Sequence, residues 1–230
     1  MLLFIFIFFL VLSLIASWQL KSRFKKYSQI ASGGNRSGRE IAEQMLRDHG
    51  IYNVNVVSTE GSLTDHYNPE TKTVNLSHDV YYGRNVAAAA VAAHECGHAV
   101  QDAHSFAWLR MRLALVPLQS VSGKILNVIF IAMFVGSFLL QNFLPIDLAL
   151  QIIIACYAIF TLFAFITLPV EIDASRRALA YLTTSGATGR DTHGYAKDAL
   201  KWAAYTYVIA ALSSLATLLY YIMIYMGRRE

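Results

Sequence analysis

The chain has 230 residues, of which 56% are hydrophobic and only 15% are charged, and its formal net charge is +4. Soluble globular domains carry more charge than this, so the composition excludes an ordinary water-soluble protein. The apolar residues gather in long runs, which is the pattern of membrane-spanning helices.

Four apolar runs are each close to the roughly 20 residues that a helix needs to cross a hydrocarbon core about 30 Å thick. They cover residues 2–20, 125–144, 148–168 and 202–226. The first run has no basic segment before it, is longer than the apolar part of a signal peptide, and is followed by "KSRFKK". We therefore interpret it as a retained anchor, and we predict a mainly α-helical membrane protein with about four transmembrane helices.

The remaining, more polar sequence predicts one small α+β domain that the second and third runs split. We predict an anchor at 1–20, a soluble or interfacial domain at 21–122, a transmembrane hairpin at 123–169, a further helix at 170–201 and a C-terminal transmembrane helix at 202–230. The segment "SGGNRSG" after the anchor is rich in glycine and serine, and we expect it to be a short flexible link.

Two stretches of this domain, 53–58 and 72–77, alternate apolar and polar residues and are separated by turn residues, which predicts a β-hairpin. We expect the hairpin to lie beside the helix described next. An extended peptide can add to the edge of such a hairpin through backbone pairing. The alternative is that the hairpin only covers the helix.

The stretch "VAAHECGHAVQ" (91–101) has the spacing of a zinc site. His94 and His98 lie four residues apart in an alanine-rich segment that favours a helix, so both lie on one helical face and can hold one zinc ion. Glu95 is the expected general base, which takes a proton from the attacking water. A catalytic zinc of this kind needs a third protein ligand.

Three residues compete for the place of the third ligand. His104 has the spacing of the pattern H-E-x-x-H-x-x-G-x-x-H, but Gln101 stands where that pattern has the glycine that turns the chain back. If the helix continues, His104 lies about 9 Å farther along the axis than the second histidine. Glu171 and Asp173 both follow Pro169, where the sequence predicts the start of a second helix. Either one can complete the site, or can instead stabilise the N-terminus of that helix.

The Lys and Arg residues predict which side of the membrane the domain occupies. Eleven of them flank the predicted spans on the domain side, whereas the loop "QNFLPID" (141–147) has none. The positive-inside rule therefore places the domain in the cytoplasm, although Arg228 and Arg229 would then lie outside. Two spans separate the histidines from Glu171, so all of these residues lie on the same side of the membrane in either orientation.

The chain resembles the YugP-type membrane zinc metallopeptidases of bacteria in the order and approximate spacing of five segments. These are "LTDHYNP" (63–69), "VNLSHDVY" (74–81), "AAHECGHAVQ" (92–101), "LALVP" (113–117) and "TLPVEIDASRRAL" (167–179). The resemblance covers residue 37 to the end. It implies a membrane-embedded zinc peptidase that is distantly similar to the clan of the CAAX prenyl proteases and heat-shock membrane proteases. Members commonly have Asn at the position of Asp173, so the resemblance favours Glu171 as the third ligand, in a gluzincin-like His, His, Glu set. Cys96 stands where members usually have an aliphatic residue.

We therefore predict an integral-membrane zinc metallopeptidase of the bacterial cell membrane, multi-pass, with its active site toward the cytoplasm and Zn²⁺ as its cofactor. Within "LTDHYNP", His66 and Tyr67 are candidates to contact the oxyanion or the substrate, although Asn68-Pro69 favour a turn there. The predicted metal ligands are His94, His98 and Glu171, with Glu95 as the catalytic base.

The expected partners are a peptide or membrane-protein substrate and the lipid bilayer. We expect no nucleic acid, because the basic residues cluster at the ends of the spans, where anionic lipid headgroups account for them. The alternative function is a non-catalytic membrane adaptor with a structural or vestigial metal site. Only the enzyme has a use for Glu95.

Overall fold

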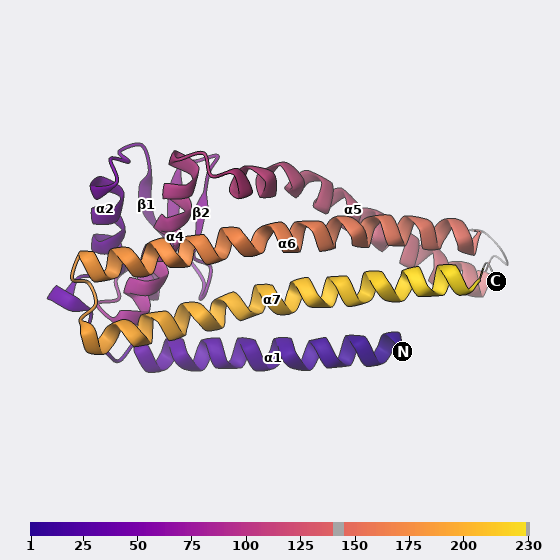
Figure 1. The fold of residues 1–230 in the computed structure, drawn as a ribbon, viewed down its shortest axis with the longest axis horizontal. Helices are drawn as coiled ribbons and strands as arrows, with labels where there is room; N and C mark the ends of the chain where they lie inside the picture. The colour runs from indigo at the N-terminus through magenta and orange to yellow at the C-terminus, as the bar shows by residue number, and fades with distance from the viewer. Residues whose placement is uncertain (140–144, 229–230) are drawn as a thin grey trace. The chain divides into compact units, whose positions relative to one another are not determined.

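The computed structural model describes residues 1–139 and 145–228, and most of them are helical (Figure 1). The elements in chain order are α1 (Leu2–Tyr27), the 3-10 helix η1 (Gly33–Asn35), α2 (Gly38–Asp48), β1 (Asn55–Thr59), β2 (His66–Asn68), β3 (Thr73–Ser77), α3 (His78–Tyr81), α4 (Val86–Ala103), α5 (Ala107–Leu139), α6 (Ile146–Thr184) and α7 (Arg190–Gly227). They form two compact units. The first unit comprises Met1–Ser13, Met111–Leu168 and Tyr207–Glu230, and the second comprises Leu14–Arg110 and Pro169–Thr206.

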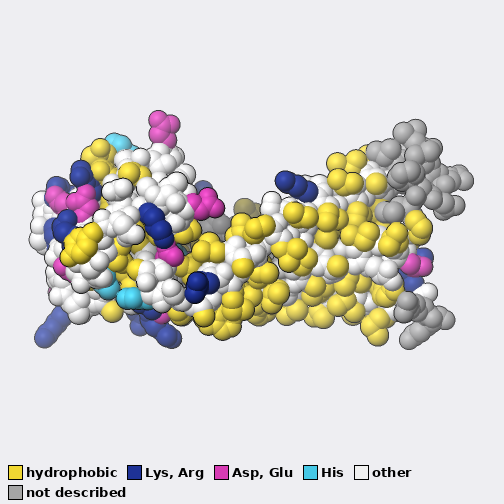
Figure 2. All heavy atoms as spheres, turned by 90° about the horizontal axis from the view of Figure 1, so that it is seen from above, with side chains coloured by type: hydrophobic (Ala, Val, Ile, Leu, Met, Phe, Trp, Pro, Cys, Tyr) yellow, Lys and Arg dark blue, Asp and Glu magenta, His cyan; other side chains and the backbone are white. Residues whose placement is uncertain are grey.

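Four helices in the described part of the chain are long and apolar enough to cross a membrane. They are Leu2–Tyr27, Ala107–Phe134, Ile146–Thr184 and Arg190–Gly227. Their number agrees with the prediction of about four transmembrane helices. Residues 140–144, where the second predicted run ends, lie outside the described residues. Hydrophobic side chains cover the face of the first unit that Figure 2 shows, and Phe4 of α1 is 73% exposed. Such a surface suits hydrocarbon rather than water.

Pro169 lies inside α6, so the prediction that a second helix begins at this residue is wrong. A proline in a helix removes one backbone N–H and therefore one hydrogen bond. Membrane-spanning helices tolerate this loss, because neighbouring groups satisfy the freed backbone atoms. The apolar run before Pro169 and the helical spacing of apolar residues after it both favour a helix, and α6 continues through the proline.

The sheet corrects the predicted hairpin. Its order is β1-β3-β2, with β3 in the middle, and it lies with α2 and α4 in the second unit (Figure 1). The strands predicted at 53–58 and 72–77 exist as β1 and β3 and do pair, but they run parallel. Residues 60–72 make this possible, since they are long enough to carry the chain back to the start of the next strand. The hairpin is instead formed by β2 and β3, which pair antiparallel with Tyr67 opposite Val74.

The turn predicted around Asn68 is present, but it begins later than expected. His66 to Asn68 form the strand β2, and the chain turns over the next four residues. The Asn68 side-chain oxygen accepts hydrogen bonds from the backbone N–H groups of Glu70 and Thr71, at 2.9 and 3.2 Å. This is the local bonding that makes asparagine a turn residue.

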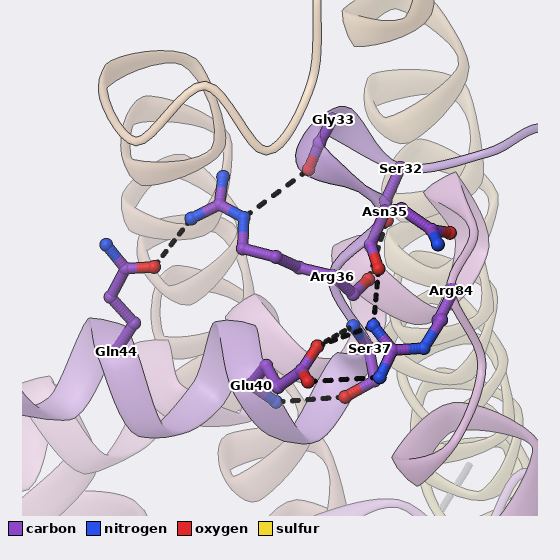
Figure 3. Close-up of polar contacts among 8 residues, drawn as sticks. All are labelled: Ser32, Gly33, Asn35, Arg36, Ser37, Glu40, Gln44 and Arg84. Carbon is purple, nitrogen blue, oxygen red and sulfur yellow. Dashed lines mark hydrogen bonds and ion pairs between the residues drawn. The ribbon is translucent and has the colours of Figure 1, made fainter.

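The link between α1 and α2 is held in place rather than flexible, contrary to the prediction. Arg36 donates to the side chain of Gln44 at 2.5 Å, and Ser37 and Glu40 form a reciprocal capping box at the start of α2 (Figure 3). Arg84 pairs with Glu40 at 2.9 Å. The polar residues of the link therefore bond to α2 and to the segment before α4.

At Gly33 the link needs a glycine because the backbone of another segment lies very close, and not because the chain needs conformational freedom there. Its N–H donates to the Ala187 carbonyl at 2.8 Å. A Cβ atom added at Gly33 would lie 2.0 Å from the carbonyl oxygen of Gly186. A glycine-rich pattern therefore marks a close backbone approach here.

The alanine-rich sequence of α4 makes it the central helix of the second unit. Asn85 caps its start, since the side-chain oxygen accepts from the Ala88 N–H at 2.9 Å. Nearly every residue from Val86 to Gln101 is buried. Small side chains let neighbouring elements approach this helix from several sides, and two of these elements build the site.

Candidate metal centre

Helix α4 carries polar side chains on two adjacent faces of an otherwise apolar helix. His94, His98 and Gln101 follow the spacing i, i+4, i+7 and share one face. Glu95 and Asp102 are seven residues apart and share the next face. The first face bonds to the part of α6 that follows Pro169, and the second bonds to β2.

Gly97 sets how closely α6 approaches α4. A Cβ atom added at Gly97 would lie 2.7 Å from the carbonyl oxygen and 3.1 Å from the Cα atom of Ala174. Real Cβ atoms do not come so close to backbone, so the two helices can touch here only because this residue has no side chain. Glu171 lies one helical turn before Ala174 and is thereby brought to the histidines.

His94, His98 and Glu171 place their ligand atoms within 4.8 Å of one another. Glu171 Oε2 lies 3.3 Å from His94 Nε2 and 3.7 Å from His98 Nε2, and the three side chains are at most 12% exposed. Ligands on a tetrahedral zinc at about 2.0–2.2 Å are separated by about 3.4 Å. The donors present therefore fit zinc, and two imidazoles with one carboxylate leave a fourth position open, as in catalytic zinc sites.

The two other residues that the sequence offered as third ligands lie outside this cluster. Asp173 Oδ2 accepts from Gln101 Nε2 at 2.9 Å and from Arg177 Nε at 2.6 Å. His104 follows the end of α4 and its side chain is exposed. The helix runs past Gln101 to Ala103, so the chain does not turn back where the glycine-containing pattern would require it.

The second nitrogen of each histidine ring has its own partner. His94 Nδ1 lies 3.1 Å from Ser175 Oγ, and His98 Nδ1 lies 3.0 Å from Gln101 Oε1. These contacts turn both Nε2 atoms toward Glu171, which is the usual way in which outer residues orient ligating histidines. Burial lowers the pKa of His98, but the hydrogen bond and charge of Glu171 outweigh it, and this pKa is raised.

Sequence reasoning missed Ser175 and the full role of Gln101. A signal for both was available in the helical spacing: Gln101 is three residues after the second histidine, and Ser175 is four residues after Glu171. Each therefore lies on the same face of its helix as a predicted ligand.

Glu95 is held by a backbone group of β2. Its carboxylate Oε2 accepts from the Tyr67 N–H at 3.0 Å, and the side chain is 9% exposed. The Tyr67 hydroxyl donates to Asp102 Oδ2 at 2.6 Å, and Lys72 Nζ lies 2.5 Å from the same oxygen. One residue of β2 is thus bonded to α4 at two positions, seven residues apart.

The charges around Tyr67 fix the ionisation of this contact. Burial, and then the hydrogen bond to Asp102, raise the pKa of Tyr67. Burial also raises the pKa of Asp102, but the hydrogen bonds from Lys72 and Tyr67 outweigh it and hold that pKa below its ordinary value. A neutral phenol therefore donates to an ionised carboxylate.

His66 and Tyr67 face opposite sides of β2, as neighbours in a strand do. His66 is exposed and its Nδ1 lies 2.8 Å from the Thr64 carbonyl oxygen. The Tyr67 hydroxyl is already bonded to Asp102. Their assignment as donors to an oxyanion stays a prediction.

Comparison with known proteins finds similarity over nearly the whole chain. The family model described as "Putative neutral zinc metallopeptidase" matches residues 2–226. The "Putative membrane protease YugP" of Bacillus subtilis (strain 168) is 38% identical to this chain over 220 residues, which are 95% of this chain and 94% of that protein. No solved structure matches the chain.

Proposed function

Because the chain belongs to the family described as "Putative neutral zinc metallopeptidase", we propose that it is an integral-membrane zinc endopeptidase. His94, His98 and Glu171 hold the ion, and Glu95 is the general base. The observation that carries this proposal is the convergence of three ligand atoms from α4 and α6 within 4.8 Å, with Glu95 next to His94 in the sequence of α4. A non-catalytic adaptor has no need of that fourth residue.

Zinc, when bound, polarises the scissile carbonyl and lowers the pKa of a water molecule. Glu95 takes a proton from the attacking water and delivers it to the leaving amine. The Tyr67 N–H bonds one carboxylate oxygen, Oε2, and thereby fixes the direction of the other. The contacts of His94 Nδ1 with Ser175 Oγ and of His98 Nδ1 with Gln101 Oε1 hold the imidazole rings so that their Nε2 atoms would be available to a bound ion.

We propose that the substrate binds as an additional strand on β2. This strand is an edge of the sheet, and the Tyr67 N–H points away from β3, toward Glu95. The N–H and C=O of one residue in a strand point to the same side, so the Tyr67 carbonyl also lies on the outer edge. A peptide N–H can donate to it, and backbone pairing of this kind selects an extended conformation more than a sequence. Peptides and membrane proteins are the expected substrates.

We propose further that the site works at the cytoplasmic face of the membrane. The support is the excess of Lys and Arg on the domain side of the apolar runs. A cysteine placed at an exposed position of the second unit, such as His104→Cys, tests this side. It should resist an impermeant thiol reagent in intact cells and react after lysis; labelling in intact cells would reverse the orientation.

Glu95→Gln is the decisive variant for the catalytic proposal. An amide keeps an oxygen for the Tyr67 N–H but cannot accept the proton from water. The purified variant should therefore retain one zinc per chain, and its rate of peptide cleavage should fall at least about a hundredfold. His104→Ala is the matched control and should keep both properties. Cleavage that survives Glu95→Gln would remove Glu95 from the mechanism.

Zinc content tests the ligand set separately. Glu171→Ala should lose zinc, whereas Asp173→Ala should retain most of it, since Asp173 bonds only to Gln101 and Arg177 among the contacts described above. If the wild-type protein holds no zinc after purification with zinc present, the adaptor becomes the better proposal.

A further inference from the structure

Gln101 is the most completely bonded buried side chain near the site. It is fully buried. Its oxygen lies 3.0 Å from His98 Nδ1, and its amide nitrogen donates to the Val170 carbonyl at 2.8 Å and to Asp173 Oδ2 at 2.9 Å. Both donors of the amide group are therefore used, and they cross from α4 to α6.

The surroundings allow only one orientation of this amide. The Val170 carbonyl and the Asp173 carboxylate accept hydrogen bonds and cannot donate them, so the NH₂ group must face them. Arg177 holds the same Asp173 oxygen at 2.6 Å, which keeps this carboxylate in place as an acceptor. The oxygen of Gln101 must then face His98.

An oxygen that faces His98 Nδ1 requires a proton on that nitrogen. A neutral imidazole carries one N–H, so the proton on Nδ1 leaves the lone pair on Nε2, the atom that faces Glu171. His94 has no such constraint. Its Nδ1 meets the hydroxyl of Ser175, which can either donate or accept.

We infer that Gln101 is a positioning residue that selects the neutral tautomer of His98 able to bind a metal through Nε2. The inference rests on the proposed function, because it treats His98 as a metal ligand. Gln101 also donates to the Val170 carbonyl, next to Glu171. It therefore fixes α6, the helix that carries Glu171, relative to the ring of His98.

Gln101→Leu tests the inference, because leucine has a similar volume and no hydrogen-bonding atoms. Two quantities are measured in detergent-solubilised full-length protein. The first is the zinc dissociation constant, by competition with a chromophoric chelator; the second is the set of ¹⁵N shifts of the histidine rings in the zinc-free protein, at a pH above the raised pKa of His98 so that the ring is neutral. We expect zinc binding to weaken by about 10- to 100-fold, the usual effect of losing an outer hydrogen bond. We also expect the wild-type His98 ring to carry its proton on Nδ1 and the variant to show both tautomers.

Two controls separate positioning from general destabilisation. Val100→Ala removes buried atoms from the same helix without touching the histidines, so it should lower the unfolding midpoint and leave zinc affinity unchanged. His104→Ala changes an exposed residue outside this hydrogen-bond network and should bind zinc as the wild type does. Gln101→Met is the second variant, should Gln101→Leu not fold.

Each result bears on one proposal. Wild-type zinc affinity in Gln101→Leu, or a wild-type His98 that carries its proton on Nε2, would overturn the inference. A wild-type protein that binds no zinc would instead overturn the proposed function, and the tautomer measured without zinc would still decide the role of Gln101.

Discussion

Gly97→Ala is the substitution for which the sequence and the structure predict opposite effects. Gly97 lies inside α4, and replacing a glycine in a helix with alanine is worth up to about 1 kcal/mol of added stability from propensity alone. The structure predicts destabilisation instead, because the new methyl group would meet the backbone of Ala174, which has no rotamer to change.

The size of the effect follows from the distances. The added Cβ would lie 2.7 Å from the Ala174 carbonyl oxygen, whereas ordinary contacts begin at 3.4 Å, so α6 must shift by several tenths of an ångström or more. Overpacking of this kind costs about 1–3 kcal/mol, which leaves a net loss of up to about 2 kcal/mol after a propensity gain of about 1 kcal/mol. The shift also carries Glu171 away from His94 and His98, so zinc affinity should fall at least about tenfold.

Gly194→Ala is the matched control for this prediction. Gly194 lies in helix α7, and a Cβ atom added there would have nothing within 4 Å. This variant should gain up to about 1 kcal/mol and bind zinc normally. Chemical unfolding of the zinc-free protein and zinc titration measure both effects. If Gly97→Ala is as stable as Gly194→Ala and binds zinc as tightly, the close approach of α4 and α6 is not what assembles the site.

Three further predictions concern the framework of the second unit. Although burial raises the pKa of Asp102, the hydrogen bonds to this carboxylate outweigh it, so its contribution to stability is present above about pH 4 and is lost as the pH falls through the lowered pKa. The unfolding midpoint of Asp102→Asn should therefore lie below that of the wild type at neutral pH, and the gap should close in acid; an unchanged gap at about pH 3 contradicts the assignment. Gly33→Ala should destabilise the protein by at least about 1 kcal/mol in chemical unfolding, because its Cβ would meet the Gly186 carbonyl oxygen at 2.0 Å, and a variant as stable as the wild type would mean that the link is loose in solution. Ser37→Ala removes the capping box of α2 and should cost about 1 kcal/mol in the same assay, with Ser37→Asp as the variant that restores the cap.

Residue spacing was sufficient to predict the helical parts of the site. The four-residue interval between His94 and His98 places them on one face whatever surrounds the helix, and an apolar run of about 20 residues predicts a long helix by its length. The choice between Glu171 and Asp173 was different in kind. It depends on how α6 is rotated against α4, which follows from the contact at Gly97 and not from any local pattern.

The sheet and the link were mispredicted because both depend on non-local partners. Alternation shows that residues 53–58 and 72–77 are strands, but it cannot give the direction in which they pair. The turn residues between them allowed a hairpin, and the short strand β2 took that place instead. In the same way, the glycine and serine residues of 32–38 have the composition of a flexible link, and only the contacts of this segment with Ser185, Gly186 and Ala187 give it a defined place in the fold.

The separation of the site's two halves along the chain has a consequence for biosynthesis. His94 and Ser175, which bond to each other, are 81 positions apart, and α5 and most of α6 are synthesised between them. A growing chain that has delivered only α4 carries Glu95 and two histidines but lacks the third donor and the partners of Gln101. Under the proposed function, the protein therefore stays inactive on the ribosome until α6 has been made, and a chain truncated before that helix cannot cleave its neighbours.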